Sequence, residues 1–340
     1  MSFKRFDKED IVISAESITS PAWSGNEVTL QSFFTSSTQE GGTSGGYYLN
    51  VYNKIITNDS TAIQFSAAYG NKVGSGSAYI NDNVVSNTPS SIVYKQYRNL
   101  INGDEETDIS FAGTNITSIY AISIERARFK EKLLPGSLTL QLGSLTLTDD
   151  SEYTSTQTFT DAGRVFNIIS GSAGTRTSTS NTVDTGQLGY SKDSGSYGLL
   201  LPDVGLIVLN GDALDNAVVD GGLALSTDKT ANNTGTVNHK LLVNKIVDGG
   251  LFTLRSEETV SSNFVFVRAR NSEFNYSTNP SNITGSGELR HDIMIDTPQS
   301  FITTVGLYND NNDLLAVAKL SRPLLKDFTK EALVRIKLDY

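Results

Sequence analysis

The chain ends on Val334-Arg335-Ile336-Lys337-Leu338-Asp339-Tyr340, in which apolar and charged residues alternate. A period of two places the apolar side chains on one face of a β-strand and the charged ones on the other. Because the alternation continues to the final residue, we expect this strand to be held in a sheet. The same patterning extends back to residue 264, through apolar runs at 264–267, 301–308 and 314–320. The segment 264–340 is therefore predicted to be a C-terminal β domain.

The composition of all 340 residues favours the same fold class. Charged residues make up 19% of the chain, below the usual quarter, and Gly, Ser, Thr and Asn are abundant. Short β-branched runs between such polar segments are typical of proteins with many strands and turns. We predict a mainly β fold of antiparallel, sandwich-like sheets, with long Ser/Thr/Gly-rich loops and two or three short helices.

Charge and cysteine content exclude several functional classes. There is no cysteine, so thiol nucleophiles, disulfides and zinc–thiolate sites are excluded. The net charge of −10 disfavours a nucleic acid or an anionic membrane surface as the main partner. No apolar run reaches the roughly 20 residues of a membrane span, and residues 1–10 do not resemble a signal peptide. We therefore expect a chain made in the cytoplasm that binds neither nucleic acid nor membrane.

Three regions follow from the order of the patterns. Residues 1–150 are predicted to be a β-rich domain with one helix over about 88–102. Thr88 is an N-cap candidate for that helix, Pro89 suits its first position, and Gly103 follows its end. Within this helix, six residues at helical spacing are expected to form one mostly apolar stripe: Ile92, Val93, Gln96, Tyr97, Leu100 and Ile101. Residues 151–262 are predicted to be rich in loops, with short helices at 212–219 and 237–247, and residues 263–340 form the C-terminal β domain.

Two short basic segments are the candidate contact sites. If the strand that begins near Ser118 stays extended, four cations point the same way: Arg126, Arg128, Lys130 and Lys132. Such a stripe needs acidic neighbours, since like charges side by side repel. Two interpretations stay open: a solvated edge strand, or a docking stripe for an acidic partner. Arg268 and Arg270 have the same spacing as Arg126 and Arg128, so an internal duplication of this segment stays an open interpretation.

Two short motifs that suggest a catalytic serine and a calcium site are better explained as turns. Residues 42–46 match G-x-S-x-G but lack the strand before them and the helix after them that a nucleophile elbow needs. Residues 309–313 are rich in Asn and Asp, but they lack the glycine and the distal glutamate of a calcium loop.

The two histidines, His239 and His291, are far apart in sequence, and the lone Trp23 is expected to be a packing anchor. We predict no catalytic, metal or cofactor site, and no enzyme.

Several segments resemble a family of virion structural proteins from contractile-tailed phages (myoviruses) that infect cyanobacteria and marine bacteria. The similar segments are 94–100, 128–136, 197–209, 274–280 and 301–340. The last of them also resembles a hairpin that recurs in phage tail-fibre and baseplate proteins. The family contributes no catalytic residues to this chain.

The resemblance implies an assembly protein located in the virion tail, most simply a wedge-type baseplate component. Its partners would be other tail proteins, in several copies arranged symmetrically. The six residues expected to contact neighbouring subunits are Arg126, Arg128, Lys130, Lys132, Arg268 and Arg270. Three alternatives stay open: a receptor-binding or fibre-type protein using Tyr47 and Tyr48, a neck or capsid decoration protein, and a polysaccharide-degrading β protein.

Overall fold

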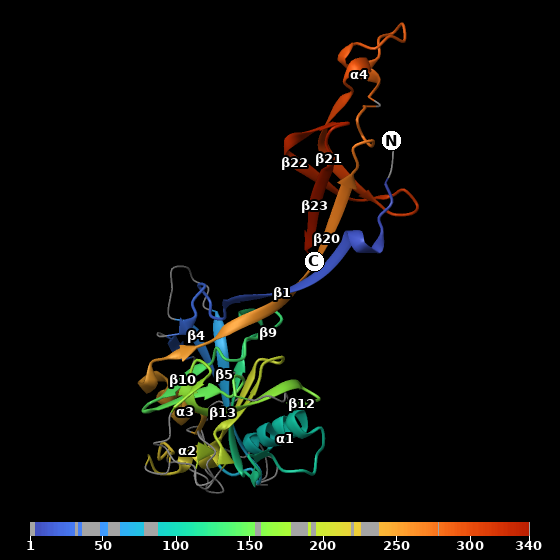
Figure 1. Ribbon diagram of the computed structural model, residues 1–340. Helices are drawn as coiled ribbons and strands as arrows, with labels where there is room; N and C mark the ends of the chain where they lie inside the picture. The colour runs from blue at the N-terminus through green and yellow to red at the C-terminus, as the bar shows by residue number, and fades with distance from the viewer. Residues whose placement is uncertain are drawn as a thin grey trace. The chain divides into compact units, whose positions relative to one another are not determined.

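The computed structural model describes residues 4–30, 33–35, 48–53, 62–77, 88–153, 158–177, 190–191, 195–218, 221–225, 238–277 and 279–339. The protein is mainly β, with 48% of its residues in strands and 17% in helices. Large antiparallel sheets and four helices make up the fold, which confirms the predicted fold class (Figure 1).

The chain forms two compact units. The barrel unit is Ile18–Glu258, and the terminal unit combines Met1–Ser17 with Thr259–Tyr340. The predicted division at residue 150 is absent from this partition, because strand β11 (Leu145–Asp149) pairs with strand β13 (Gly163–Ser172) across it. The predicted division after residue 262 lies close to the observed one at Glu258.

One large antiparallel sheet dominates the barrel unit. Its strands lie in the order β2-β19-β10-β11-β13-β17-β18-β8-β5-β4-β3, and β12 and β14 add to β13. Besides β11 and β13, the strands of this sheet are β2 (Thr29–Leu30), β3 (Phe33–Thr35), β4 (Tyr48–Asn53), β5 (Ile63–Asn71), β8 (Ser118–Ile124), β10 (Thr139–Leu142), β12 (Thr158–Thr160), β14 (Thr175–Arg176), β17 (Gly198–Leu201), β18 (Leu206–Asn210) and β19 (Phe252–Thr253). The two ends of this order, β2 and β3, are consecutive in sequence, and the sheet is a nearly closed barrel.

The central strands of this sheet are buried on both faces. In β8, Tyr120, Ile122 and Ile124 join one apolar cluster, whereas Ile119 and Ala121 join another. Strand β18 is buried along its whole length, as its unbroken apolar run predicted. Trp23 is buried in the first cluster, packs against Phe65 and Phe252, and donates from Nε1 to the Phe252 carbonyl oxygen at 2.9 Å, which confirms its role as an anchor.

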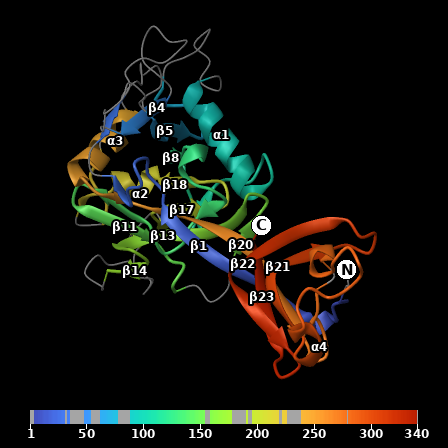
Figure 2. The same ribbon diagram turned by 90° about the horizontal axis from the view of Figure 1, so that it is seen from above.

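Helices α1 (Pro89–Asn102) and α3 (Asn238–Gly249) lie on opposite sides of strands β4, β5 and β8 (Figure 2). Helix α1 begins and ends as predicted. The Thr88 side chain accepts from the Ser91 amide, and Gly103, with φ of 73°, donates its N–H to the Asn99 carbonyl oxygen. Helix α3 matches the prediction for 237–247, and α2 (Gly211–Asp215) is shorter than the predicted 212–219.

The predicted apolar stripe of α1 is only partly correct. Tyr94, outside that stripe, is fully buried, whereas Ile92, within it, is 51% exposed. The reason is Gly70 in β5, where an added Cβ would lie 2.9 Å from both the Tyr94 nitrogen and Ile119 Cγ1. The missing side chain lets the helix backbone approach the strand at Tyr94, so this residue faces the sheet.

The remaining elements of the barrel unit are short. They are the pair β6 (Ser110–Phe111) and β7 (Thr114–Asn115), the pair β15 (Tyr190–Ser191) and β16 (Gly195–Ser196), β9 (Lys132–Leu133), and the 3₁₀ helix η3 (Arg126–Arg128).

The terminal unit contains two layers of strands. One is formed by β23 (Ala332–Asp339) with parts of the long strands β1 (Ile11–Pro21) and β20 (Arg255–Ala269), in the order β1-β20-β23. The other is the hairpin of β21 (Gln299–Tyr308) and β22 (Leu314–Asp327). Helix α4 (Ile293–Asp296), which was not predicted, and the 3₁₀ helices η1 (Lys8–Asp10) and η5 (Pro280–Asn282) complete the unit.

The C-terminal pattern behaves as the sequence predicted. In β23, Val334, Ile336 and Leu338 are buried or half-buried, whereas Arg335 and Lys337 are exposed. Ile336 packs with Val265 of β20 and Leu307 of β21, and these three residues are the buried centre of the unit. Residues 309–313 form the hairpin turn, in which Asn309 Oδ1 accepts from the amides of Asn311 and Asp313.

Candidate functional site

The basic run 126–132 does not form one extended strand. Strand β8 ends at Ile124, and η3 turns the chain, with the Arg128 amide donating to the Glu125 carbonyl oxygen at 2.8 Å. This turn buries Phe129 in the core, where its ring lies against Gly205. The prediction that the four cations share one strand face is wrong. The 3₁₀ turn at Arg126–Arg128 ends the extended segment, and burial of the apolar Phe129 side chain favours this turn.

The lysines of this run contact acidic residues of the same chain. Lys130 Nζ lies 2.6 Å from Glu258 Oε1, and Lys132 Nζ lies 3.6 Å from Glu257 Oε2. Both glutamates belong to β20, which pairs with β9 at this position. The acidic neighbours that the cations require are thus supplied by the chain itself.

The arginines of the first segment differ in exposure. The exposed Arg126 donates from Nη1 to the Phe129 carbonyl oxygen at 2.9 Å, and its guanidinium lies 4.6 Å from the centre of the Phe129 ring. Arg128 is half-buried. Arg126 is therefore the more accessible of the two.

The second basic segment, Arg268 and Arg270, has a different backbone conformation from the first. Arg268 lies in β20 and donates from Nη2 to Glu331 Oε2 at 2.8 Å, whereas Arg270 lies just beyond the strand and is exposed. A strand here and a 3₁₀ helix at Arg126–Arg128 give the duplication no local structural support. Of the six predicted residues, the first four belong to the barrel unit, and Arg268 and Arg270 belong to the terminal unit.

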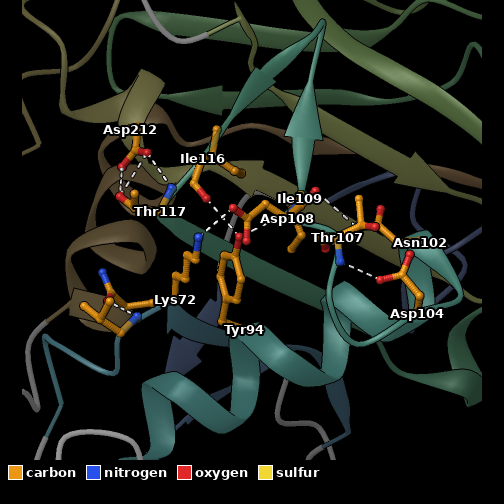
Figure 3. Close-up of polar contacts among 12 residues, drawn as sticks. Lys72, Tyr94, Asn102, Asp104, Thr107, Asp108, Ile109, Ile116, Thr117 and Asp212 are labelled. Atoms are coloured by element: carbon orange, nitrogen blue, oxygen red, sulfur yellow. Dashed lines mark hydrogen bonds and ion pairs between the residues drawn. The ribbon is translucent and has the colours of Figure 1, made fainter.

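A polar network ties α1 to the segment that follows it (Figure 3). The buried Tyr94 hydroxyl donates to the Ile116 carbonyl oxygen at 2.9 Å and accepts from the Ile109 amide at 3.4 Å. Nearby, Lys72 Nζ lies 2.6 Å from Asp108 Oδ2. Burial raises the pKa of Tyr94 to about 12, so this hydroxyl stays protonated at neutral pH and acts as a structural donor.

Asp212, the second residue of α2, extends this network. Its carboxylate accepts from the Thr117 amide at 2.8 Å and from the Ser118 hydroxyl at 2.7 Å (Figure 3). The contacts join the first turn of α2 to the start of β8. Each of these polar groups holds a loop or a helix end, and this arrangement is typical of structural hydrogen bonding.

The two histidines belong to different units. His239 is buried in α3, and burial lowers its pKa to about 4, whereas His291 is exposed. Across the ranges that the structure describes, no group of three His, Asp or Glu side chains could hold a metal ion. Tyr47 and the G-x-S-x-G match lie outside these ranges, and Tyr48 is exposed at the start of β4.

Several large apolar side chains of the β21–β22 hairpin are exposed. We define the apolar hairpin surface as Phe301, Leu314, Leu315 and Val317, of which Leu315 is 68% exposed, Phe301 62% and Val317 57%. A β-bulge leaves Leu315 with no residue opposite it in β21. Leu333 of β23, in the other strand layer of the unit, is also 65% exposed. Leu314, Leu315 and Val317 lie within four residues of one strand, and exposed apolar side chains so close together are candidates for an interaction site.

No family model matches the chain, and comparison with curated proteins and with solved structures found no similar protein. None of the helices in the described part of the chain has the length and apolar character to span a membrane.

The apolar runs 301–308 and 314–320 are the sequence signal for the apolar hairpin surface, but their composition does not separate core side chains from exposed ones. In the structure, only some of their side chains, such as Leu307, reach the small core. Val317, which lies opposite Gly306, is exposed.

Proposed function

We propose that this chain is a structural protein of a phage virion, a tail baseplate component that binds neighbouring tail subunits. The observation that carries the proposal is the apolar hairpin surface of the terminal unit. The resemblance of residues 94–100, 128–136, 197–209, 274–280 and 301–340 to virion proteins of contractile-tailed phages supports the choice of particle.

The terminal unit has too small a core for its exposed apolar surface. Its buried centre consists of Val265, Leu307 and Ile336, whereas Phe301, Leu315 and many other large apolar residues remain in contact with solvent. Burial of apolar area contributes about 25 cal/mol per Å², so covering these side chains would stabilise an assembly. A unit of this kind is suited to docking against neighbouring subunits.

The basic residues contribute less to the proposed contact than the apolar residues do. Lys130 and Lys132 form ion pairs with Glu258 and Glu257, and Arg268 forms an exposed ion pair with Glu331, so these three cations already have partners within the chain. Arg126 and Arg270 are the exposed cations that remain suited to a contact with an acidic neighbour. The proposed contact surface is thus mainly apolar, with these arginines at most contributing to orientation.

The test is incorporation of tagged variants into virus particles produced in infected cells. We expect the wild-type chain in purified particles, and at least a tenfold loss for Phe301→Glu combined with Leu333→Glu. Arg126→Glu combined with Arg128→Glu should reduce incorporation less. A matched control is Val204→Glu with Val247→Glu, two exposed positions of the barrel unit. If the wild-type chain is absent from particles, or the apolar variants enter them normally, the proposal is wrong.

A further inference from the structure

The β22 segment of the hairpin changes its chemical character along its length. The turn before it contains Asp310 and Asp313, its first residues include Leu314, Leu315 and Val317, and Lys319 and Arg322 follow. The three apolar side chains are 52%, 68% and 57% exposed, respectively. An acidic end and a basic end therefore flank an exposed apolar centre.

This segment also has backbone groups available for pairing. Strand β22 is hydrogen-bonded to β21 on one edge, and within the described ranges no other strand pairs with it. An exposed apolar strand with one unpaired edge is a template for pairing with another chain. Lys319 is the only charged residue between positions 314 and 321.

The charge balance of the terminal unit permits close approach of two copies. This unit holds 12 Lys and Arg residues against 13 Asp and Glu, whereas the barrel unit holds 15 against 24. The acidic excess of the protein thus lies almost entirely in the barrel unit. Two terminal units meet no large like-charge repulsion, and neither offers a strong net field to a highly charged partner.

We propose that the occupant of this surface is a second copy of the chain, with residues 314–319 of the two copies antiparallel about a twofold axis near Ala316. In this arrangement Asp313 of each copy meets Lys319 of the other, because both lie three residues from Ala316. The exposed Leu315 side chain of each copy then lies beside the exposed Val317 side chain of the other, because both positions are one residue from Ala316. A parallel arrangement would instead place like charges together, so the reversal of charge along the segment selects its own antiparallel copy.

This inference rests on the proposed function for the use of the apolar hairpin surface in assembly, but it can be tested on the purified chain alone. Sedimentation equilibrium over a range of concentrations should give twice the chain mass for the wild type. Asp313→Lys and Lys319→Asp should each weaken the dimer at least tenfold. The double variant should restore the dimer to within about threefold of the wild type, since it exchanges the two charges.

Val317→Lys places two cations near the axis and should give a monomer. Its control is Val247→Lys, an exposed valine of α3, which should leave the dimer intact. Circular dichroism of every variant verifies folding. A wild-type monomer at all concentrations, or a charge exchange that fails to restore the dimer in a folded protein, overturns the inference. A monomer that still enters particles leaves the proposed function standing, and a dimer absent from particles contradicts only that function.

Discussion

The Nζ atom of Lys326 lies 2.6 Å from Oδ1 of Asn275, and both residues are buried. The same ammonium donates to the carbonyl oxygens of Asn271 and Asp327, at 3.0 and 2.9 Å. Three neutral oxygens thus surround a lysine at the base of the β21–β22 hairpin. The contacts hold the loop that follows β20 against the end of β22.

Replacing this lysine should loosen the hairpin. Lys326→Met keeps the apolar stem but leaves buried acceptors unpaired, at a cost of about 1–3 kcal/mol. We expect faster hydrogen exchange in residues 271–275 and lower thermal stability of the terminal unit. Lys330→Met is the control, since the ion pair of Lys330 with Asp327 is exposed and 3.8 Å long. Equal exchange in the two variants would contradict a structural role for Lys326.

The C-terminal alternation and the ends of α1 could be predicted because they depend on local rules. The period of two around Ile336 and the Thr88 and Gly103 caps each follow from a few neighbouring residues. The buried Lys326 could not be predicted, because lysine is almost always exposed and two of its three acceptors, in Asn271 and Asn275, lie 55 and 51 positions away in sequence. The turn at Arg126 was missed for a related reason, since it depends on Phe129 packing beside the distant Gly205.

The exposed hairpin residues show a second limit of sequence patterns. Leu307 and Val317 both lie in apolar runs, and only the pairing of the strands decides which of them meets the core. Hydrophobicity alone does not distinguish a side chain that this chain buries from one that it leaves exposed. The contact residues predicted from the sequence are all cations, and Lys130, Lys132 and Arg268 are paired within the chain.

The Tyr94 hydroxyl should stabilise the docking of α1. Tyr94→Phe removes the bond to the Ile116 carbonyl oxygen and leaves the Ile109 amide without this acceptor, which should cost about 1–3 kcal/mol. Urea unfolding followed by circular dichroism measures the loss. The matched control is Tyr276→Phe, at a tyrosine that is 63% exposed. An unchanged midpoint for Tyr94→Phe would show that water replaces the lost partner.

The missing side chain of Gly70 should be required for the contact between β5 and α1. Gly70→Ala places a methyl group 2.9 Å from the Tyr94 backbone nitrogen, and overpacking of this kind typically costs about 1–3 kcal/mol. Thermal unfolding should therefore occur at a lower temperature. Gly285→Ala is the control, because nothing lies within 4 Å of the added carbon there. If both variants melt like the wild type, the helix can shift away from β5 at little cost.

The buried His239 should make stability depend on pH. Burial and the neighbouring Lys240 lower its pKa from 6.5 to about 4 in the folded state, so the folded protein binds this proton less readily than the unfolded chain. The contribution of the neutral ring to stability is complete above pH 6.5 and is lost as the pH falls towards 4. A shift of this size corresponds to roughly 3 kcal/mol.

The His239→Gln variant should flatten the stability profile between pH 6.5 and 4, measured as the free energy of unfolding in urea. Asp203, whose pKa is lowered, loses its contribution below the unfolded value of 3.8, outside this window, whereas Glu273 loses its contribution below 4.5 in the wild type and in the variant alike. Burial raises the pKa of Asp149, an effect that favours the folded state as the pH falls and so cannot mimic the loss from His239. His291→Gln, at the exposed histidine, should keep the wild-type profile. A wild-type slope in His239→Gln would show that another group carries the dependence.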